Sequence, residues 1–274
     1  MTLLTHWEGE PVSVWTERWR VPLFEAHDEV GSTSDRLKEI AGQGAGLFSV
    51  VISEAQTAGR GRRSATWHSP AESGLWLSVL LPAPSRSVAY LPLIVGLATA
   101  RAIEQAAPGI NAGIEWPNDV VIAGAKVAGV LCEAAGGGPM QPVAGVVAGI
   151  GVNVRTPVGG FPQDISGRAI SLEGAAEARV SRSALASAIL TELVRVTKSE
   201  GSAGAGVAVE PYGRTLSQPT LEALKGRDVL SNRRVYSEQE GAGVARGILE
   251  SGALLLERED GSRVGVVAGS VRPE

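Results

Sequence analysis

Two glycines and three arginines stand within five consecutive positions, Gly59-Arg60-Gly61-Arg62-Arg63. The flanking segments 48–54 and 74–81 are rich in β-branched and apolar residues, which predicts two strands joined by this stretch. Glycine tolerates positive φ and lets the backbone approach a ligand closely, and guanidinium groups are planar donors that suit carboxylate or phosphate. The sequence therefore predicts an anion-binding loop. For the loop taken alone, a solvated basic turn and an Arg-Gly contact to RNA remain alternatives.

Length and charge narrow the class of protein. The 274 residues suffice for one large domain and one small one with a substantial core. A net charge of −4 at pH 7, spread along the chain, argues against the broad positive face that nucleic-acid binding requires. A single cysteine fits a reducing, cytoplasmic location, no apolar run reaches membrane-spanning length, and the three histidines lack ligand spacing. We therefore expect no DNA partner, no membrane partner and no dedicated metal site.

Turn signals and hydrophobic periodicity divide the chain into three parts. Residues 1–27 carry three of the six tryptophans and predict a lead-in packed on the main domain. Residues 28–222 predict an α+β domain, in which the Gly-, Ala- and Ser-rich segment 199–209 reads as a loop. Residues 223–274 predict a small all-β domain of SH3-like size. The predicted helices are 32–41, 92–107 and 185–196, and the predicted strands are 48–54, 74–81, 120–122, 125–131, 143–154, 228–230, 234–236, 244–249, 254–257 and 264–267.

Two local patterns in the main domain predict close contacts. Ser32-Thr33-Ser34-Asp35 fits a capping box, and a helix N-terminus lined by hydroxyls also presents free N–H groups to a ligand. In segment 143–154, Gly145, Gly149 and Gly151 remove side chains, which is typical of close backbone approach to a neighbour or a ligand.

Lys126 is the third feature of interest. Strand alternation predicts that it shares a face with Ala128 and Val130. A lysine among apolar neighbours needs an anionic partner if it is buried. The alternative is an edge-strand lysine that prevents aggregation.

Taken together and in this order, these stretches resemble the biotin protein ligase family. The matching motifs are Ser32-Thr33 before a helix, Gln56 to Arg63 with Trp67, Trp116-Pro117-Asn118-Asp119, Lys126 to Glu133, and Gly149 to Val154. The resemblance implies a mixed sheet with helices, like that of class II aminoacyl-tRNA synthetases, and a C-terminal SH3-like β-barrel. Because the first motif begins near residue 30, the chain looks like the monofunctional type without a DNA-binding domain. A homodimer formed through an exposed sheet edge is compatible with the sequence.

The resemblance also implies a reaction and its partner. ATP and biotin would give biotinyl-5′-AMP, and the acyl group would pass to a specific lysine of a biotin carboxyl carrier domain, from acetyl-CoA carboxylase or another biotin-dependent carboxylase. A carboxylate attacks a polyanionic triphosphate poorly, so such a site must neutralise charge with cations.

The family motifs carry over to individual residues. The implied biotin-binding residues are Ser32, Thr33, Ser34, Gln56, Arg60, Gly61, Arg62, Lys126 and Gly129. The implied ATP-binding residues are Arg62, Arg63, Trp67, Asn118 and Lys126, with Mg²⁺ as the counter-ion of ATP. The implied catalytic residues are Lys126, Arg62 and Asp119, and Asp119 would receive and orient the incoming lysine.

Three positions depart from the family pattern. Ser34 stands where asparagine is usual, Ala65 where an arginine is usual, and Glu115 where a lysine usually precedes the Trp-Pro-Asn-Asp motif. A carboxylate near ATP is electrostatically unfavourable. These departures leave open a paralogue that binds biotin or its adenylate with weakened catalysis. A lipoate or octanoate ligase of the same superfamily is a further alternative.

Overall fold

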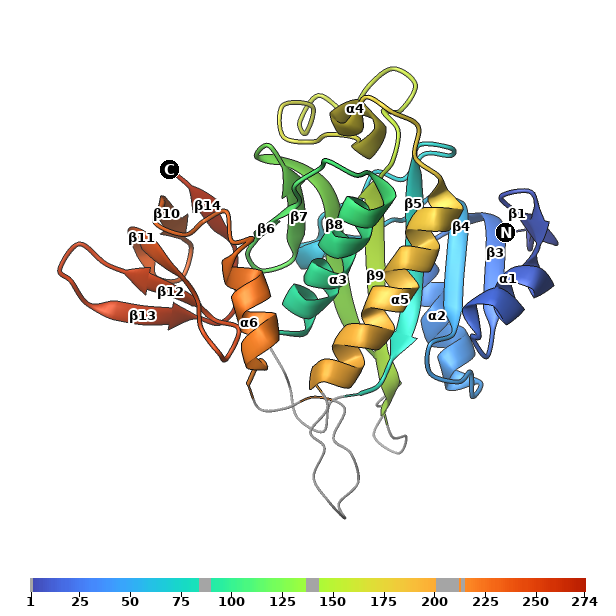
Figure 1. Cartoon of the computed structure of the whole chain (residues 1–274), viewed down its shortest axis with the longest axis horizontal. Coiled ribbons are helices and arrows are strands. Elements are labelled where there is room, and N and C mark those ends of the chain that lie inside the picture. The colour runs from blue at the N-terminus through green and yellow to red at the C-terminus, as the bar shows by residue number, and fades with distance from the viewer. Residues whose placement is uncertain (1, 84–89, 137–142, 201–211, 213–214) are drawn as a thin grey trace, which may run out of the picture.

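The computed structural model of this chain describes residues 2–83, 90–136, 143–200, 212 and 215–274 (Figure 1). Within them, the main sheet has seven strands in the order β3-β4-β5-β9-β8-β7-β6. β3 and β4 run parallel and the other neighbours antiparallel, so the sheet is mixed, as predicted. The strands are β3 (Phe24–Val30), β4 (Val50–Gln56), β5 (Gly74–Leu81), β6 (Gly113–Glu115), β7 (Asp119–Ile122), β8 (Ala125–Gly136) and β9 (Val143–Asn153).

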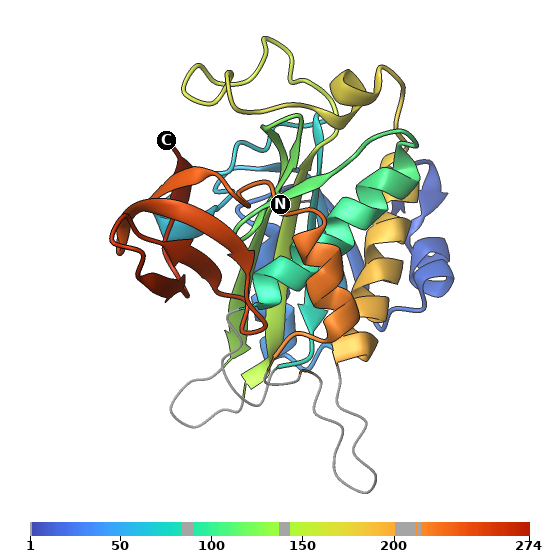
Figure 2. The same cartoon turned by 60° about the vertical axis from the view of Figure 1, so that its left-hand side comes forward.

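Helices cover both faces of this sheet (Figures 1 and 2). On one face lie α3 (Leu91–Ala106) and α5 (Arg182–Glu200), and α3 is largely buried, as its apolar circumference predicts. On the other face lies α2 (Thr33–Gly42), which packs on β4, β5, β8 and β9 over a smaller apolar cluster. A short helix, α4 (Leu172–Ala176), follows β9. The α2 face of the sheet is the one on which Ser34 lies against Gly149.

The N-terminal residues pack on the main sheet, because Trp7 and Trp15 belong to the same core cluster as residues of β3, β4 and β5. They contain β1 (His6–Trp7), β2 (Glu10–Pro11) and α1 (Val12–Trp19). Trp7 contacts Trp15, Trp19 and Phe24 edge-on, with ring centroids 5.6 to 6.0 Å apart. The sequence prediction missed β3, which runs across residue 27 where the lead-in was expected to end.

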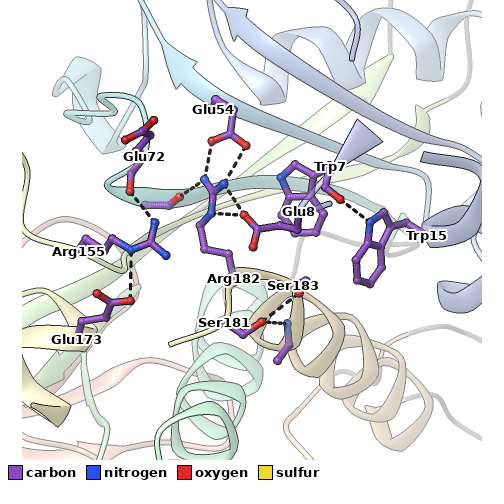
Figure 3. Close-up of polar contacts among 12 residues, drawn as sticks. Trp7, Glu8, Trp15, Glu54, Glu72, Arg155, Glu173, Ser181, Arg182 and Ser183 are labelled. Carbon is purple, nitrogen blue, oxygen red and sulfur yellow. Dashed lines mark hydrogen bonds and ion pairs between the residues drawn. The ribbon is translucent and has the colours of Figure 1, made fainter. Parts of the chain in front are cut away.

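Arg182 fastens the lead-in to the sheet (Figure 3). Its Nη1 and Nη2 donate to the two carboxylate oxygens of Glu54 on β4, at 2.6 and 3.0 Å. Its Nε and Nη2 donate to Glu8 Oε1, at 2.8 and 2.5 Å. The Arg182 side chain is only 9% exposed, so this fork joins α5, β4 and the turn between β1 and β2 in a largely dry environment.

The C-terminal part forms a separate five-stranded sheet within the described residues, in the order β13-β12-β11-β10-β14. Its strands are β10 (Arg234–Ser237), β11 (Gly241–Ile248), β12 (Leu254–Glu257), β13 (Arg263–Val266) and β14 (Val271–Pro273). Four of these overlap predicted strands. The strand predicted at 228–230 is wrong, because the chain turns there and Asp228 forms only an isolated bridge to Ile114 of β6. Preceding this sheet, α6 (Gln218–Lys225) runs across residue 222, where the domain boundary was expected.

A further sequence prediction concerns the segment that follows α5. Ser199 and Glu200 were predicted in a loop but form the last turn of α5, and the remainder of that loop, 201–209, lies outside the described residues. Among the described helices, none combines the length and apolar character needed to cross a membrane.

Candidate active site

The N-terminus of α2 and the middle of β5 form a cluster of hydroxyl groups. Thr33 Oγ1 lies 2.8 Å and Ser34 Oγ 3.0 Å from Ser78 Oγ. Thr33 also donates its N–H and its hydroxyl to Gln56 Oε1, at 2.9 and 3.2 Å. Ser32 is the N-cap residue but its side chain forms no capping hydrogen bond, so the predicted capping box is wrong. The acidic member of that box, Asp35, pairs instead with Arg60 at 2.8 Å.

Three glycines without side chains lie on the sheet surface beside this cluster, where other residues pack directly on the backbone. Gly129 and Gly151 face each other across β8 and β9, and the Trp67 ring lies against both. A methyl group built on Gly151 would lie 2.4 Å from Trp67 Nε1, and one on Gly149 would lie 2.6 Å from Ser34 Oγ. The close approach predicted for Gly149 and Gly151 is therefore confirmed.

Lys126 points to the same face of the sheet as these glycines. Its Nζ lies 2.7 Å from Asp119 Oδ1 and 5.0 Å from the centroid of the Trp67 ring, and a methyl built on Gly129 would lie 3.2 Å from it. The sequence prediction that Lys126 shares a face with Ala128 and Val130 is wrong. The pairing of β7 with β8 shifts register at Val127, since Val120 opposes Ala128 while Val121 opposes Lys126, and such a bulge turns the following side chains to the other face.

The arginine loop is a small hairpin, with Gly61 N–H bonded to Ala65 O at 2.7 Å and Trp67 N–H to Gly59 O at 2.9 Å. Its three guanidinium groups have different partners. Arg60 pairs with Asp35 and with Glu133, at 2.8 and 2.7 Å.

The other two arginines reach the C-terminal sheet. Arg62 donates to Asn118 Oδ1 at 3.1 Å and to Gly269 O at 2.8 Å. Arg63 pairs with Glu238 and lies 3.3 Å from Ser270 Oγ. Arg62 is therefore the loop arginine that adjoins the Trp-Pro-Asn-Asp segment.

The charges around Lys126 perturb their neighbours. Burial raises the pKa of Glu115, the Asp119 carboxylate adds to this, and Lys126 opposes it. Burial lowers the pKa of the Arg62 guanidinium, while Asp119 acts in the opposite direction. Two acids, a lysine and an arginine thus share a partly desolvated corner, in which a change of one charge is felt by the others.

The structure groups most of the predicted site residues in two neighbouring sets. One set contains Thr33, Ser34 and Gln56, and the other contains Arg62, Trp67, Asn118, Asp119, Lys126 and Gly129. Arg60 and Arg63 belong to neither set, because Arg60 pairs with Asp35 and Glu133 and Arg63 pairs with Glu238.

Two residues that hold these sets together were missed. Ser78 is the polar residue in an otherwise apolar strand, which is a signal that could have been used. Ser69 accepts a hydrogen bond from Gln56 Nε2 at 2.8 Å, and no pattern in the sequence indicated it.

Comparison with known proteins identifies the family to which this chain belongs. The model of the biotin/lipoate A/B protein ligase family matches residues 31–153, the segment that carries both sets. The biotin--[acetyl-CoA-carboxylase] ligase of Mycobacterium tuberculosis is 34% identical over 252 residues, which cover 89% of this chain and 86% of that protein. The chain belongs to the biotin/lipoate A/B protein ligase family.

Solved structures within this family reproduce the fold. The biotin protein ligase of Aquifex aeolicus, in complex with biotin and ATP, superposes with a TM-score of 0.75 at 25% identity, covering 92% of this chain and 99% of that one. The bifunctional ligase/repressor BirA of Bacillus subtilis is 37% identical over 170 residues, 60% of this chain. Because the match covers half of that repressor's length, it concerns only part of that protein.

Proposed function

We propose that this chain activates biotin with ATP to give biotinyl-5′-AMP and transfers the biotinyl group to a lysine of a biotin carboxyl carrier domain. The observation that carries the proposal is the Lys126–Asp119 pair, placed beside Arg62 and Asn118 and next to the hydroxyl cluster of α2. Family membership and the likeness to a ligase bound to biotin and ATP support it.

Each set of residues has a proposed task. The hydroxyls and the amide of the first set would hold the polar ureido ring of biotin, and the Trp67 ring, which lies against Gly129 and Gly151, would line the apolar tail. Lys126 and Arg62 would neutralise charge where the biotin carboxylate meets the α-phosphate. The biotin-binding set is proposed as Ser32, Thr33, Ser34, Gln56, Arg60, Gly61, Arg62, Lys126 and Gly129, and the ATP-binding set as Arg62, Arg63, Trp67, Asn118 and Lys126.

Finer features remain part of the proposal. Mg²⁺ is assigned as the counter-ion of ATP, and the described residues contain no group of three or more His, Cys, Asp or Glu side chains that could hold a resident metal. We propose that the C-terminal sheet is an SH3-like barrel and that the main sheet is related to class II aminoacyl-tRNA synthetases. A carrier domain as partner, a cytoplasmic location and a homodimer are proposed on the sequence arguments alone.

The test is biotin-dependent release of pyrophosphate from Mg·ATP, measured with and without an apo carrier domain and followed by the intact mass of the carrier. Release that requires biotin, together with one biotinyl mass on the carrier, is the expected result. Biotin binding without release would instead indicate a binding protein with weakened catalysis. A preference for lipoate or octanoate over biotin would overturn the proposed substrate.

Asp119→Asn is expected to spare adenylate formation more than transfer. The incoming lysine, with an unperturbed pKa of about 10.4, must be oriented and deprotonated, and Asp119 is the carboxylate closest to Lys126 Nζ. Transfer from preformed biotinyl-5′-AMP should fall by about 100-fold, within the range for a general base. The measurement is single-turnover labelling of the carrier, with the exposed Asp28→Asn as control; full-rate transfer in Asp119→Asn would refute the assigned role.

Glu115→Lys is expected to lower the KM for ATP by about 3- to 10-fold. The Glu115 carboxylate lies within the electrostatic reach of Asp119 and Lys126, and reversing its charge adds about 1 kcal/mol of attraction for a polyanion in a partly solvated site. Glu115→Gln, which only removes the charge, should give an intermediate KM. Identical ATP affinity in all three proteins would show that Glu115 does not face the nucleotide.

A further inference from the structure

Ser78 lies where two hydroxyls of the proposed biotin site converge. It is completely buried in β5, 2.8 Å from Thr33 Oγ1 and 3.0 Å from Ser34 Oγ. Its backbone pairs with Gly149 of β9, and the missing side chain of Gly149 leaves the space that Ser34 Oγ occupies. Neither the sequence motifs nor the proposed roles above assign a task to Ser78.

The hydrogen bonds around it have one consistent direction. The Thr33 N–H can only donate, so the Gln56 atom that it meets at 2.9 Å is the amide oxygen. The Gln56 amide nitrogen therefore donates to Ser69 Oγ at 2.8 Å, and the Ser69 hydroxyl donates to Trp67 O at 3.1 Å. Because the Gln56 oxygen only accepts, the Thr33 hydroxyl proton is directed to it at 3.2 Å.

This direction propagates through Ser78. With its own proton directed to Gln56, Thr33 Oγ1 can only accept from Ser78. Ser78, having donated, can only accept from Ser34. Each hydroxyl has one proton and two acceptor lone pairs, so the chain leaves one lone pair on Thr33 and two on Ser34, with no proton free on either.

We propose that Ser78 is a positioning residue that sets the donor and acceptor polarity of the biotin pocket. With Ser78 donating to Thr33 and accepting from Ser34, both pocket hydroxyls meet a ligand only as acceptors and select ring N–H groups. This inference rests on the proposed function, since the ureido ring of biotin supplies two N–H donors. It also gives a chemical role to Ser34, where the family usually has asparagine: a serine without a free proton accepts and does not donate.

The test compares biotin with its two cyclic carbamate analogues, in each of which one ureido N–H is replaced by O. Affinities are measured by titration calorimetry without ATP. An ether oxygen opposite an acceptor leaves the acceptor unpaired, so the wild-type protein should prefer biotin over at least one carbamate by about 10- to 100-fold. In Ser78→Ala, the Ser34 proton loses its partner and can turn to the ligand, so this preference should fall by at least about 5-fold.

Two matched variants distinguish an effect of the Ser78 hydrogen bonds from an effect of side-chain packing. Ser53→Ala removes a buried hydroxyl from the neighbouring strand, where it donates locally to Ala55 O at 2.7 Å, and should leave the preference unchanged. Ser78→Thr keeps the hydroxyl in the buried site and should keep the preference, whatever its effect on total affinity.

The outcomes are distinct. An equal loss of affinity for biotin and for both carbamates in Ser78→Ala would reduce Ser78 to a packing residue and overturn the inference. A wild-type protein that binds biotin without distinguishing it from the carbamates would also overturn it, while leaving the proposed function intact. A wild-type protein that binds none of the three would refute the proposed function itself.

Discussion

Lys126→Ala is expected to lower the rate of biotin-dependent pyrophosphate release by about 100- to 1,000-fold, the range for removal of one preorganised charge donor from an active site. Lys126 Nζ lies 2.7 Å from Asp119 Oδ1 and 5.0 Å from the centroid of the Trp67 ring, over the backbone of Gly129. Without it, two anionic substrates would meet beside Asp119 and Glu115. The loss should appear mainly in kcat, because charge neutralisation is needed most where charge accumulates in the transition state.

Lys225→Ala is the matched control, since it removes an exposed lysine near the end of α6 and should leave the rate unchanged. Lys126→Arg separates charge from geometry: it retains the positive charge, but a planar fork replaces a compact ammonium. Pyrophosphate release at the wild-type rate in Lys126→Ala would remove Lys126 from the catalytic set.

The sequence predicted the composition of this site better than its geometry. The motifs that resemble the family placed Lys126, Asp119 and Asn118 in one site, and the structure brings them together with Arg62. The direction in which Lys126 points was predicted wrongly, because strand alternation assumes regular pairing. The extra residue at Val127 interrupts that pairing, and nothing in the run of apolar residues around it signals a bulge.

Contacts between residues that lie far apart in the sequence were also not predicted. Ser78 contacts Thr33 and Ser34 from 45 and 44 positions away, respectively. The arginines of the loop are divided among partners on α2, β8 and the C-terminal sheet. The loop composition predicts anion binding, but which guanidinium faces the site depends on carboxylates such as Asp35 and Glu238. That competition is decided by tertiary structure, which local patterns do not encode.

Arg182→Ala is expected to destabilise the folded chain by about 3 to 5 kcal/mol, the cost of removing one partner from a buried ion pair. The variant would leave the Glu54 and Glu8 carboxylates facing each other with no cation between them (Figure 3). Glu54 lies on β4 two residues before Gln56, so the same change should loosen the strand that carries Gln56 of the proposed biotin-binding set. The measurement is the urea midpoint, with biotin affinity measured well below the transition.

Two comparisons test whether the unpaired Glu8 and Glu54 carboxylates cause the loss of stability in Arg182→Ala. Arg179 lies three residues before α5, is 85% exposed and pairs with Glu173 at 3.3 Å. Arg179→Ala should change the free energy of unfolding by no more than about 0.5 kcal/mol. Adding Glu8→Gln and Glu54→Gln to Arg182→Ala should restore part of the loss, because the unpaired carboxylates, and not the missing hydrogen bonds, account for most of the cost. If the triple variant were less stable than Arg182→Ala, the repulsion argument would be wrong.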